Sequence, residues 1–300
     1  MRYPLDPQEQ AHLAQFIADG LREDVGPGDV TSLACIPDSS RQTARLLVKD
    51  QGVLAGTAVA FAILRAADPS CTIHPILEDG QDVHPGDVAF TVEGSTRALL
   101  QAERLLLNTM QRMSGIATET RRYCTRIADL PTRILDTRKT TPLLRFLEKW
   151  AVRIGGGQNY RNGLYDWFMI KDNHVDACGG SIRTAIERVA AYQRTHGLSL
   201  NVTVEVRNME ELEEVLKTGQ ITRIMFDNFA PGALQQALQK VGKRFETEAS
   251  GGITLDTLRE YALSGVDYIS IGALTHSFKS LDLSFKINRW PIRVRGKLAR

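Results

Sequence analysis

The second half of the chain alternates short apolar runs with longer segments whose apolar residues recur every three to four positions. The short runs are typical of buried β-strands, and the longer segments have the period of amphipathic α-helices. Strands that alternate with helices favour a parallel α/β sheet. We expect strands at 132–139, 168–172, 201–206, 223–228, 246–252 and 267–272, and helices at 142–154, 182–196, 209–218, 231–241 and 254–264.

Residues able to take part in chemistry or in ligand binding recur near the ends of these strands at a short, regular spacing. Glu205, Asp227, Ser250 and Gly272 follow one another every 22 or 23 residues, which leaves room for one strand, one helix and two short loops. Only six strands are evident, with room for a seventh near a helix break expected at Gly115. We therefore expect an open or incomplete α/β barrel rather than a full eight-stranded one.

The first half of the chain follows a different pattern. Short alternating strands broken by glycine turns indicate a small α+β domain, which the basic, strand-like tail from Leu283 is expected to rejoin. We expect an N-terminal domain of residues 1–115 together with 276–300, and a barrel domain of residues 116–275. The expected elements are a helix at 8–22, a turn-rich connector at 23–32, strands at 43–50, 52–56, 73–77 and 88–94, a helix at 58–68, and a long helix at 96–115 that continues to about 127.

Composition narrows the class of protein only slightly. The 300 residues, 43% hydrophobic and 24% charged, are ordinary for a globular protein, and a net charge of +2 gives no sign of nucleic-acid binding. The longest apolar stretch, 52–64, is too short to span a membrane, and the polar N-terminus has no signal-peptide core. Four widely spaced cysteines favour reduced thiols and a cytoplasmic location, and argue against a zinc site.

Positive charges gather where the first strands of the barrel end. Arg138 and Lys139 end the first strand, Arg161 follows a glycine loop, and Lys171 ends the second strand. Active sites of parallel α/β barrels lie at this end of the strands. Each cation alone could be a solvated surface charge or the partner of a nearby acid. Four that converge need a negatively charged ligand to offset their repulsion, so the pattern predicts an anion site.

Carboxylates and glycine turns end the later strands. Glu205 and Asp227 stand beside apolar residues, and a buried carboxylate needs a cation, a metal or ligand hydroxyls. This pair is suited to Mg²⁺ or to sugar hydroxyls, and the alternative is a structural salt bridge to the nearby cations. The turns at 250–253 and 271–274 are typical of phosphate sites, although tight turns need glycine for other reasons too.

Two further residues permit both a structural and a functional role. Arg104 lies in a leucine-rich helix outside the barrel, where the default is a surface residue paired with neighbours such as Glu103 or Asn108. The functional alternative is that Arg104 reaches into a site, including that of another subunit. His174 lies next to 171–173, and the two interpretations are equally open for it.

The sequence resembles the quinolinate phosphoribosyltransferases, also called carboxylating nicotinate-nucleotide pyrophosphorylases. The resemblance implies an N-terminal α/β sandwich and an incomplete α/β barrel, in a homodimer or higher homo-oligomer whose active site is shared through Arg104. It also implies a reaction of NAD biosynthesis, in which quinolinate and 5-phosphoribosyl 1-pyrophosphate give nicotinate mononucleotide, pyrophosphate and CO₂. The resemblance rests on residues 23–32, 103–118, 136–142, 148–164, 169–174, 204–206, 226–228, 249–253 and 270–277.

The resemblance also implies roles for individual residues. Catalytic roles fall to Lys139, Lys171, Glu205 and Asp227, of which Glu205 and Asp227 hold Mg²⁺. One residue departs from the family, because Tyr160 stands where a histidine is usual near the dicarboxylate pocket, and tyrosine carries no positive charge at neutral pH. The implied substrate-binding set is Arg104, Thr137, Arg138, Lys139, Tyr160, Arg161, Lys171, Glu205, Asp227, Ser250, Gly251, Gly252, Ile271, Gly272 and Ala273.

Three other functions remain as alternatives. A paralogous phosphoribosyltransferase would act on another anionic base such as nicotinate, although the full set of cations argues for a dianionic substrate. A barrel lyase would use Lys171 as a Schiff base, which requires an apolar setting that Asp172 and the nearby arginines do not offer. A non-catalytic anion-binding protein would not need the two carboxylates.

Overall fold

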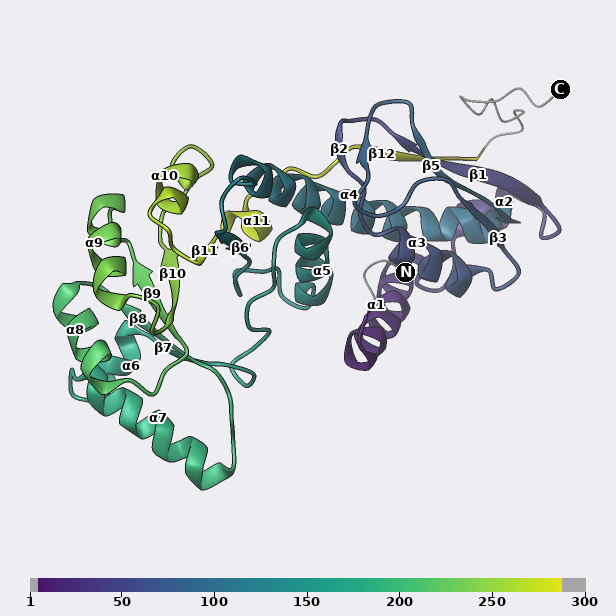
Figure 1. Ribbon diagram of the computed structural model, residues 1–300. Coiled ribbons are helices and arrows are strands. Elements are labelled where there is room, and N and C mark those ends of the chain that lie inside the picture. Colours follow the sequence, from purple (N-terminus) through teal and green to yellow (C-terminus); the bar gives the residue numbers. More distant parts are fainter. Residues whose placement is uncertain (1–4, 288–300) are drawn as a thin grey trace. The chain divides into compact units, whose positions relative to one another are not determined.

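The computed structural model describes residues 5–287, which divide into two compact units (Figure 1). The first unit takes in the chain up to Thr118 and again from Lys279, and the second unit is Glu119–Phe278. Within residues 5–287, none of the helices is both long enough and apolar enough to cross a membrane.

The first unit is built on a four-stranded sheet with the strand order β12-β1-β5-β3. Its three pairings are antiparallel, and β1 buries Ala44, Leu46 and Val48 on alternate positions, so that one face of the sheet forms the core. The strands are β1 (Arg41–Val48), β3 (Thr72–Pro75), β5 (Val88–Ser95) and β12 (Leu283–Ile287), beside a ribbon of β2 (Gly52–Val53) and β4 (Asp82–Val83). The helices are α1 (Pro7–Val25), α2 (Val30–Cys35), α3 (Thr57–Ala67) and α4 (Thr96–Arg126). The expected return of the tail from Leu283 to this sheet is confirmed up to Ile287; the rest of the tail lies outside the described residues.

Two expectations for this region are wrong. α4 is one uninterrupted helix of 31 residues with Gly115 inside it, so neither the expected break nor a seventh strand exists there. Ser114, next to Gly115, instead joins α4 to Ala55, because its hydroxyl accepts a hydrogen bond from Ala55 N and donates one to Ala55 O. The connector at 23–32 is partly helical, since Asp29 caps α2 by accepting a hydrogen bond from Ser32 N.

The second unit is a six-stranded parallel sheet with the order β6-β11-β10-β9-β8-β7. The two end strands, β6 and β7, do not pair with each other within the described residues, so the expected incomplete α/β barrel is confirmed. These are the six strands predicted from the sequence: β6 (Arg133–Leu135), β7 (Phe168–Ile170), β8 (Val202–Val206), β9 (Arg223–Asp227), β10 (Glu246–Ser250) and β11 (Tyr268–Ser270).

Helices alternate with these strands, and α7 and α8 pack against β7 and β8 (Figure 1). They are α5 (Arg145–Gly155), α6 (Asp172–Ala177), α7 (Ile182–His196), α8 (Met209–Thr218), α9 (Pro231–Val241), α10 (Leu258–Leu263) and α11 (Ala273–His276). Asn208 caps α8, because its side chain accepts a hydrogen bond from Glu211 N. α5 begins three residues later than expected because Leu143 has a left-handed backbone, with φ of 66°. The short helices α6 and α11 were not predicted.

Candidate active site

The predicted carboxylates and Lys171 come together on one face of the barrel. Residues two apart in a strand share a face. Glu205 aligns with Met225, which is two residues before Asp227, and Asp227 aligns with Ser250. Lys171 Nζ lies 2.8 Å from Glu205 Oε2, and the lysine side chain is 43% exposed while that of Glu205 is 8% exposed. The ammonium therefore neutralises a buried carboxylate and keeps donors for a ligand.

Arg138 and Arg161 are two cations without a carboxylate partner in the part of the chain described. The Nε of Arg138 is buried and makes no hydrogen bond within residues 5–287. Arg161 donates only a long hydrogen bond, 3.4 Å, to Trp167 O. Burial, and after it the charge of Arg138, lowers the pKa of the Arg161 guanidinium from its ordinary value. Two repelling guanidinium groups and an unused buried donor are the environment expected of an anion site.

Lys139 extends over the end of β11. Its backbone N–H donates to Thr137 Oγ1, and its carbonyl accepts from the Thr275 hydroxyl. A Cβ on Gly272 would come within 2.9 Å of Lys139 Cδ, whereas the φ of Gly272, −67°, is open to any residue. The φ of Gly272 therefore does not require glycine, and the nearest neighbour of an added Cβ is the flexible side chain of Lys139. The N–H of Ile271 bonds to Leu135 O and is not available to a ligand, while Ala273 begins the four-residue α11.

The turn after β10 does require glycine. Gly251 and Gly252 have φ of 96° and 62°. A Cβ on Gly251 would also lie 2.2 Å from Asn228 Oδ1. Asn228 links this turn to the carboxylate beside it, because its backbone N–H donates to Ser250 O and its side chain donates to Asp227. The turn is thus held against Asp227, and the exposed Gly252 is open to solvent.

Tyr160 lies deeper than its position next to Arg161 suggested. Its hydroxyl is 2.6 Å from Thr203 Oγ1, its ring packs edge-on against Trp167, and the residue is only 8% exposed. Burial raises the pKa of the Tyr160 hydroxyl. The phenol is therefore packed in the barrel interior, and its expected place near a dicarboxylate pocket stays a prediction.

A buried ionic layer in this interior was missed from the sequence. The Arg223 guanidinium lies 3.2 Å from Glu248 Oε2 and 4.0 Å from the centre of the Tyr268 ring. Ser270 donates a short hydrogen bond to the same carboxylate. Burial raises the pKa of Glu248, opposed by Ser270 and Arg223. The sequence contains a pattern that predicts this layer. Glu246, Glu248 and Ser250 occupy every second position of β10, so they share one face of the strand and indicate a polar barrel interior.

Arg104 and His174, for which both a structural and a functional role were open, differ in their contacts. Arg104 is exposed on α4 in the first unit, and the expected pairing with neighbours is absent among the residues described. His174 has a structural contact, since its Nδ1 accepts a hydrogen bond from Lys171 N at the start of α6.

Comparison with protein families decides the class. A family model described as the quinolinate phosphoribosyl transferase N-terminal domain matches residues 29–114, and the model of the C-terminal domain matches residues 116–286. The chain belongs to the quinolinate phosphoribosyltransferase family. The resemblance drawn from the sequence is therefore confirmed.

Individual members of the quinolinate phosphoribosyltransferase family are similar over most of their length. The chloroplastic nicotinate-nucleotide pyrophosphorylase [carboxylating] of Arabidopsis thaliana is 45% identical, with 92% of this chain and 83% of that protein covered. The probable nicotinate-nucleotide pyrophosphorylase [carboxylating] of Bacillus subtilis is 42% identical, with 88% and 90% covered. The crystal structure of NadC from Streptococcus pyogenes superposes with a TM-score of 0.88 at 37% identity, with 94% and 97% covered.

Glu205 and Asp227 lie at the carboxyl ends of the neighbouring strands β8 and β9, and the expectation that they hold Mg²⁺ stays a prediction. Within residues 5–287, no three His, Cys, Asp or Glu side chains gather in a way that could hold a metal ion. Mg²⁺ commonly keeps several waters and binds one or two carboxylates together with substrate phosphates. The two carboxylates on neighbouring strands fit that kind of site, in which the substrate supplies much of the coordination.

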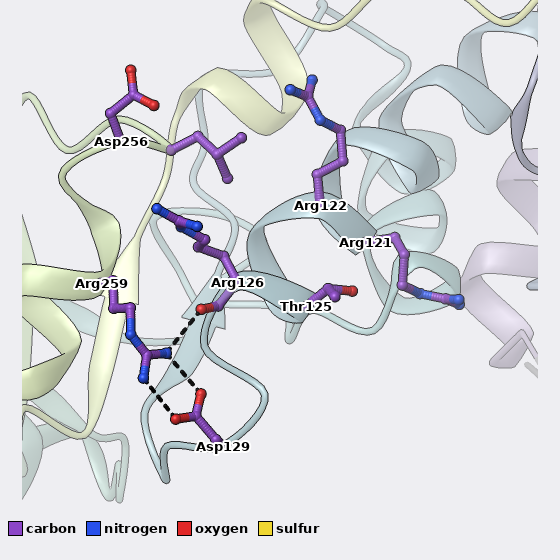
Figure 2. A pocket seen from close by; sticks show the side chains of 8 residues that line it. Arg121, Arg122, Thr125, Arg126, Asp129, Asp256 and Arg259 are labelled. Atoms are coloured by element: carbon purple, nitrogen blue, oxygen red, sulfur yellow. Dashed lines mark hydrogen bonds and ion pairs between the residues drawn. The ribbon is translucent and has the colours of Figure 1, made fainter.

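An arginine-rich pocket is lined by residues of α4, Asp129 and the segment from Leu255 to Arg259 (Figure 2). Arg259 grips Asp129 with two hydrogen bonds of 2.7 Å, which tie α10 to the end of α4, and this pair lowers the pKa of Asp129 to about 2. The guanidinium groups of Arg121, Arg122 and Arg126 point in different directions (Figure 2), so the pocket does not form a cradle for a single anion. None of the predicted site residues lines it.

Proposed function

We propose that this protein transfers the 5-phosphoribosyl group of 5-phosphoribosyl 1-pyrophosphate to quinolinate, with loss of CO₂, to give nicotinate mononucleotide. The observation that carries the proposal is the pair of guanidinium groups, Arg138 and Arg161, which have no carboxylate partner among the described residues, in the same unit as the Lys171–Glu205 pair. Relatives that are 42–45% identical are named as carboxylating nicotinate-nucleotide pyrophosphorylases. Such an activity belongs to NAD biosynthesis.

The cations account for binding of two anionic substrates. We assign Arg138 and Arg161 to the carboxylates of quinolinate, because arginine binds a carboxylate through two parallel hydrogen bonds. We assign Lys139 to the departing pyrophosphate, since its ammonium has no partner among residues 5–287 and a lysine neutralises phosphate as a point charge. The turn at 250–252 is assigned to the 5′-phosphate, because it ends a late strand, contains two glycines with positive φ and is exposed at Gly252, as suits an anion.

The carboxylates account for the chemical steps. As the bond from ribose C1 to pyrophosphate breaks, positive charge develops on the ribose, and Glu205 and Asp227 stabilise it. The ring nitrogen of quinolinate attacks C1 with its lone pair, so no general base is needed. The ring is then cationic at nitrogen and stabilises the electron pair left at C2 when the carboxylate departs as CO₂, and C2 then takes up a proton from solvent. When bound, Mg²⁺ would neutralise the charge of the phosphates at Glu205 and Asp227.

The first prediction concerns substrate choice. With Mg²⁺ and 5-phosphoribosyl 1-pyrophosphate, the protein is expected to release equal amounts of CO₂ and pyrophosphate from quinolinate, and to release no pyrophosphate with nicotinate. A coupled pyrophosphate assay beside a CO₂ assay measures both. Pyrophosphate release with nicotinate, and no release of pyrophosphate or CO₂ with quinolinate, would instead favour a paralogous phosphoribosyltransferase.

We further propose a homodimer or higher homo-oligomer in which Arg104 completes the site of a neighbouring subunit. Support comes from the exposed guanidinium of Arg104, which has no partner among the residues described. A cytoplasmic location stays an expectation from the cysteine pattern, and some plant relatives are named as chloroplastic or mitochondrial.

The second prediction tests this sharing. An Arg104→Ala subunit mixed with a Lys171→Ala subunit is expected to regain activity, because each hybrid dimer contains one site with both residues intact. For random pairing, about a quarter of wild-type activity is expected. Steady-state assays after verified subunit exchange provide the measurement. Hybrids that stay inactive would place Arg104 outside the neighbour's site.

A further inference from the structure

A buried ion pair lies behind the two arginines. Asp136 follows β6 directly and is 0% exposed, while Lys149 lies in α5 and is 2% exposed. Lys149 Nζ lies 2.5 Å from Asp136 Oδ1. Burial raises the pKa of Asp136 and lowers the pKa of Lys149, and the attraction of each for the other opposes both changes. An ion pair this deeply buried adds little stability over apolar side chains of the same size, so stability does not explain its presence.

The pair holds both backbone polar groups of Tyr160. The N–H of Tyr160 donates to Asp136 Oδ1 over 2.8 Å, and its carbonyl accepts from Lys149 Nζ over 3.2 Å. Asn159 adds a hydrogen bond of 2.6 Å from its side chain to Asp136 Oδ2. Arg161 is the next residue in the chain, and Arg138 is two residues beyond Asp136. One ion pair therefore fixes the backbone that carries both guanidinium groups.

Little else joins these two backbone segments at this point. Gln158 N donates to Ile134 O, and Asp136 N donates to Gln158 O, which gives a single parallel bridge at the open edge of β6. α5 supplies a second tie, because Arg145 donates to Thr140 Oγ1 at 3.0 Å and to Asn162 O at 2.7 Å. The separation of the two arginines thus depends on polar side chains of α5 rather than on a continuous strand ladder.

We propose that Asp136 and Lys149 are positioning residues that set the separation of Arg138 and Arg161, and thereby the preference for an aromatic dicarboxylate over a monocarboxylate. The inference rests on the proposed function. A dicarboxylate gains from two guanidinium groups only when both lie at the spacing of its two carboxylates. Displacement by about 1 Å can reduce such a geometric gain up to a hundredfold. A monocarboxylate needs one guanidinium and does not depend on the spacing.

The test uses a double variant, Asp136→Asn with Lys149→Met, which removes both charges and leaves neither buried alone. Calorimetric titration of the full chain gives Kd for quinolinate, nicotinate and 5-phosphoribosyl 1-pyrophosphate. Quinolinate affinity is expected to fall at least about tenfold, while the other two change less than about threefold. A purely structural pair would leave the ratio of quinolinate to nicotinate affinity unchanged, and that result would overturn the proposal.

A milder variant and a matched control complete the design. Asn159→Ala removes one hydrogen bond to Asp136 from a partly exposed position, so it keeps the test valid if the double variant does not fold. It is expected to weaken quinolinate binding alone, by about threefold. The control, Asp129→Asn with Arg259→Met, removes an ion pair of the same unit outside the site and should change no Kd. Wild-type protein that fails to bind quinolinate would defeat the proposed function itself, whereas an unchanged preference in the two test variants defeats only the positioning role.

Discussion

Replacing Arg138 with alanine is expected to weaken quinolinate binding about a hundredfold or more without loss of stability. The guanidinium has a buried Nε with no hydrogen-bond partner in the described chain, and it lies near enough to Arg161 to lower the pKa of that residue. A buried donor without a partner costs about 1–3 kcal/mol in the free protein. Its removal offsets the packing lost with the arginine stem, so the free energy of unfolding should stay constant or rise.

Calorimetric titration measures the affinity of Arg138→Ala for quinolinate, and thermal unfolding measures its stability. Arg161→Ala should behave in the same way. Arg126→Ala is the matched control, because Arg126 is exposed near the end of α4 and outside the candidate site. Unchanged quinolinate affinity in Arg138→Ala or Arg161→Ala would contradict the assignment of these residues as an anion site.

Replacing Arg223 with methionine is expected to destabilise the protein by about 3–5 kcal/mol. The arginine side chain is 5% exposed and neutralises Glu248, whose side chain is fully buried. Without the arginine, that carboxylate must either stay charged in the barrel interior or take up a proton. Both states are less favourable than the pair, because burial penalises the charge and the protonated acid loses its cationic partner.

The companion variant separates charge from packing. Arg223→Met with Glu248→Gln leaves no uncompensated charge, and it should recover most of the stability lost in the single variant. Urea unfolding of both proteins gives the two free energies. A single variant within about 1 kcal/mol of wild type would contradict this expectation, because it would show that proton uptake or solvent neutralises Glu248 at little cost without Arg223.

The architecture was predictable because periodicity alone distinguishes these elements. All six barrel strands and the helices α5, α7, α8, α9 and α10 have apolar positions at the expected spacing, although α10 covers only Leu258–Leu263 of the expected 254–264. Gly115 misled the prediction because glycine lowers helix propensity, whereas the sequence does not show that α4 packs closely against Ala55 there. The later start of α5 was not predictable, because a leucine in the sequence gives no indication of the left-handed backbone that Leu143 adopts.

The candidate site was only half predictable. Strand ends revealed Arg138, Lys171 and Glu205, since their positions follow from barrel topology. The sequence did not show how deeply Tyr160 is buried, although consecutive side chains of an extended segment point to opposite sides. Lys149 was overlooked among the polar residues of a helix. Its apolar neighbours in the sequence indicated that Lys149 is buried, since α5 buries every residue from Leu147 to Val152.

The pairing of β12 with β1 has a consequence for synthesis of the protein. β1 is made early, whereas the strand that covers one of its edges is made after the whole barrel. At about 5–20 residues per second, this edge waits for tens of seconds on the ribosome. Unpaired strand edges attract other chains. The first unit therefore completes its sheet only after the barrel has been made, and fusions near Ile287 should disturb it before they disturb the barrel.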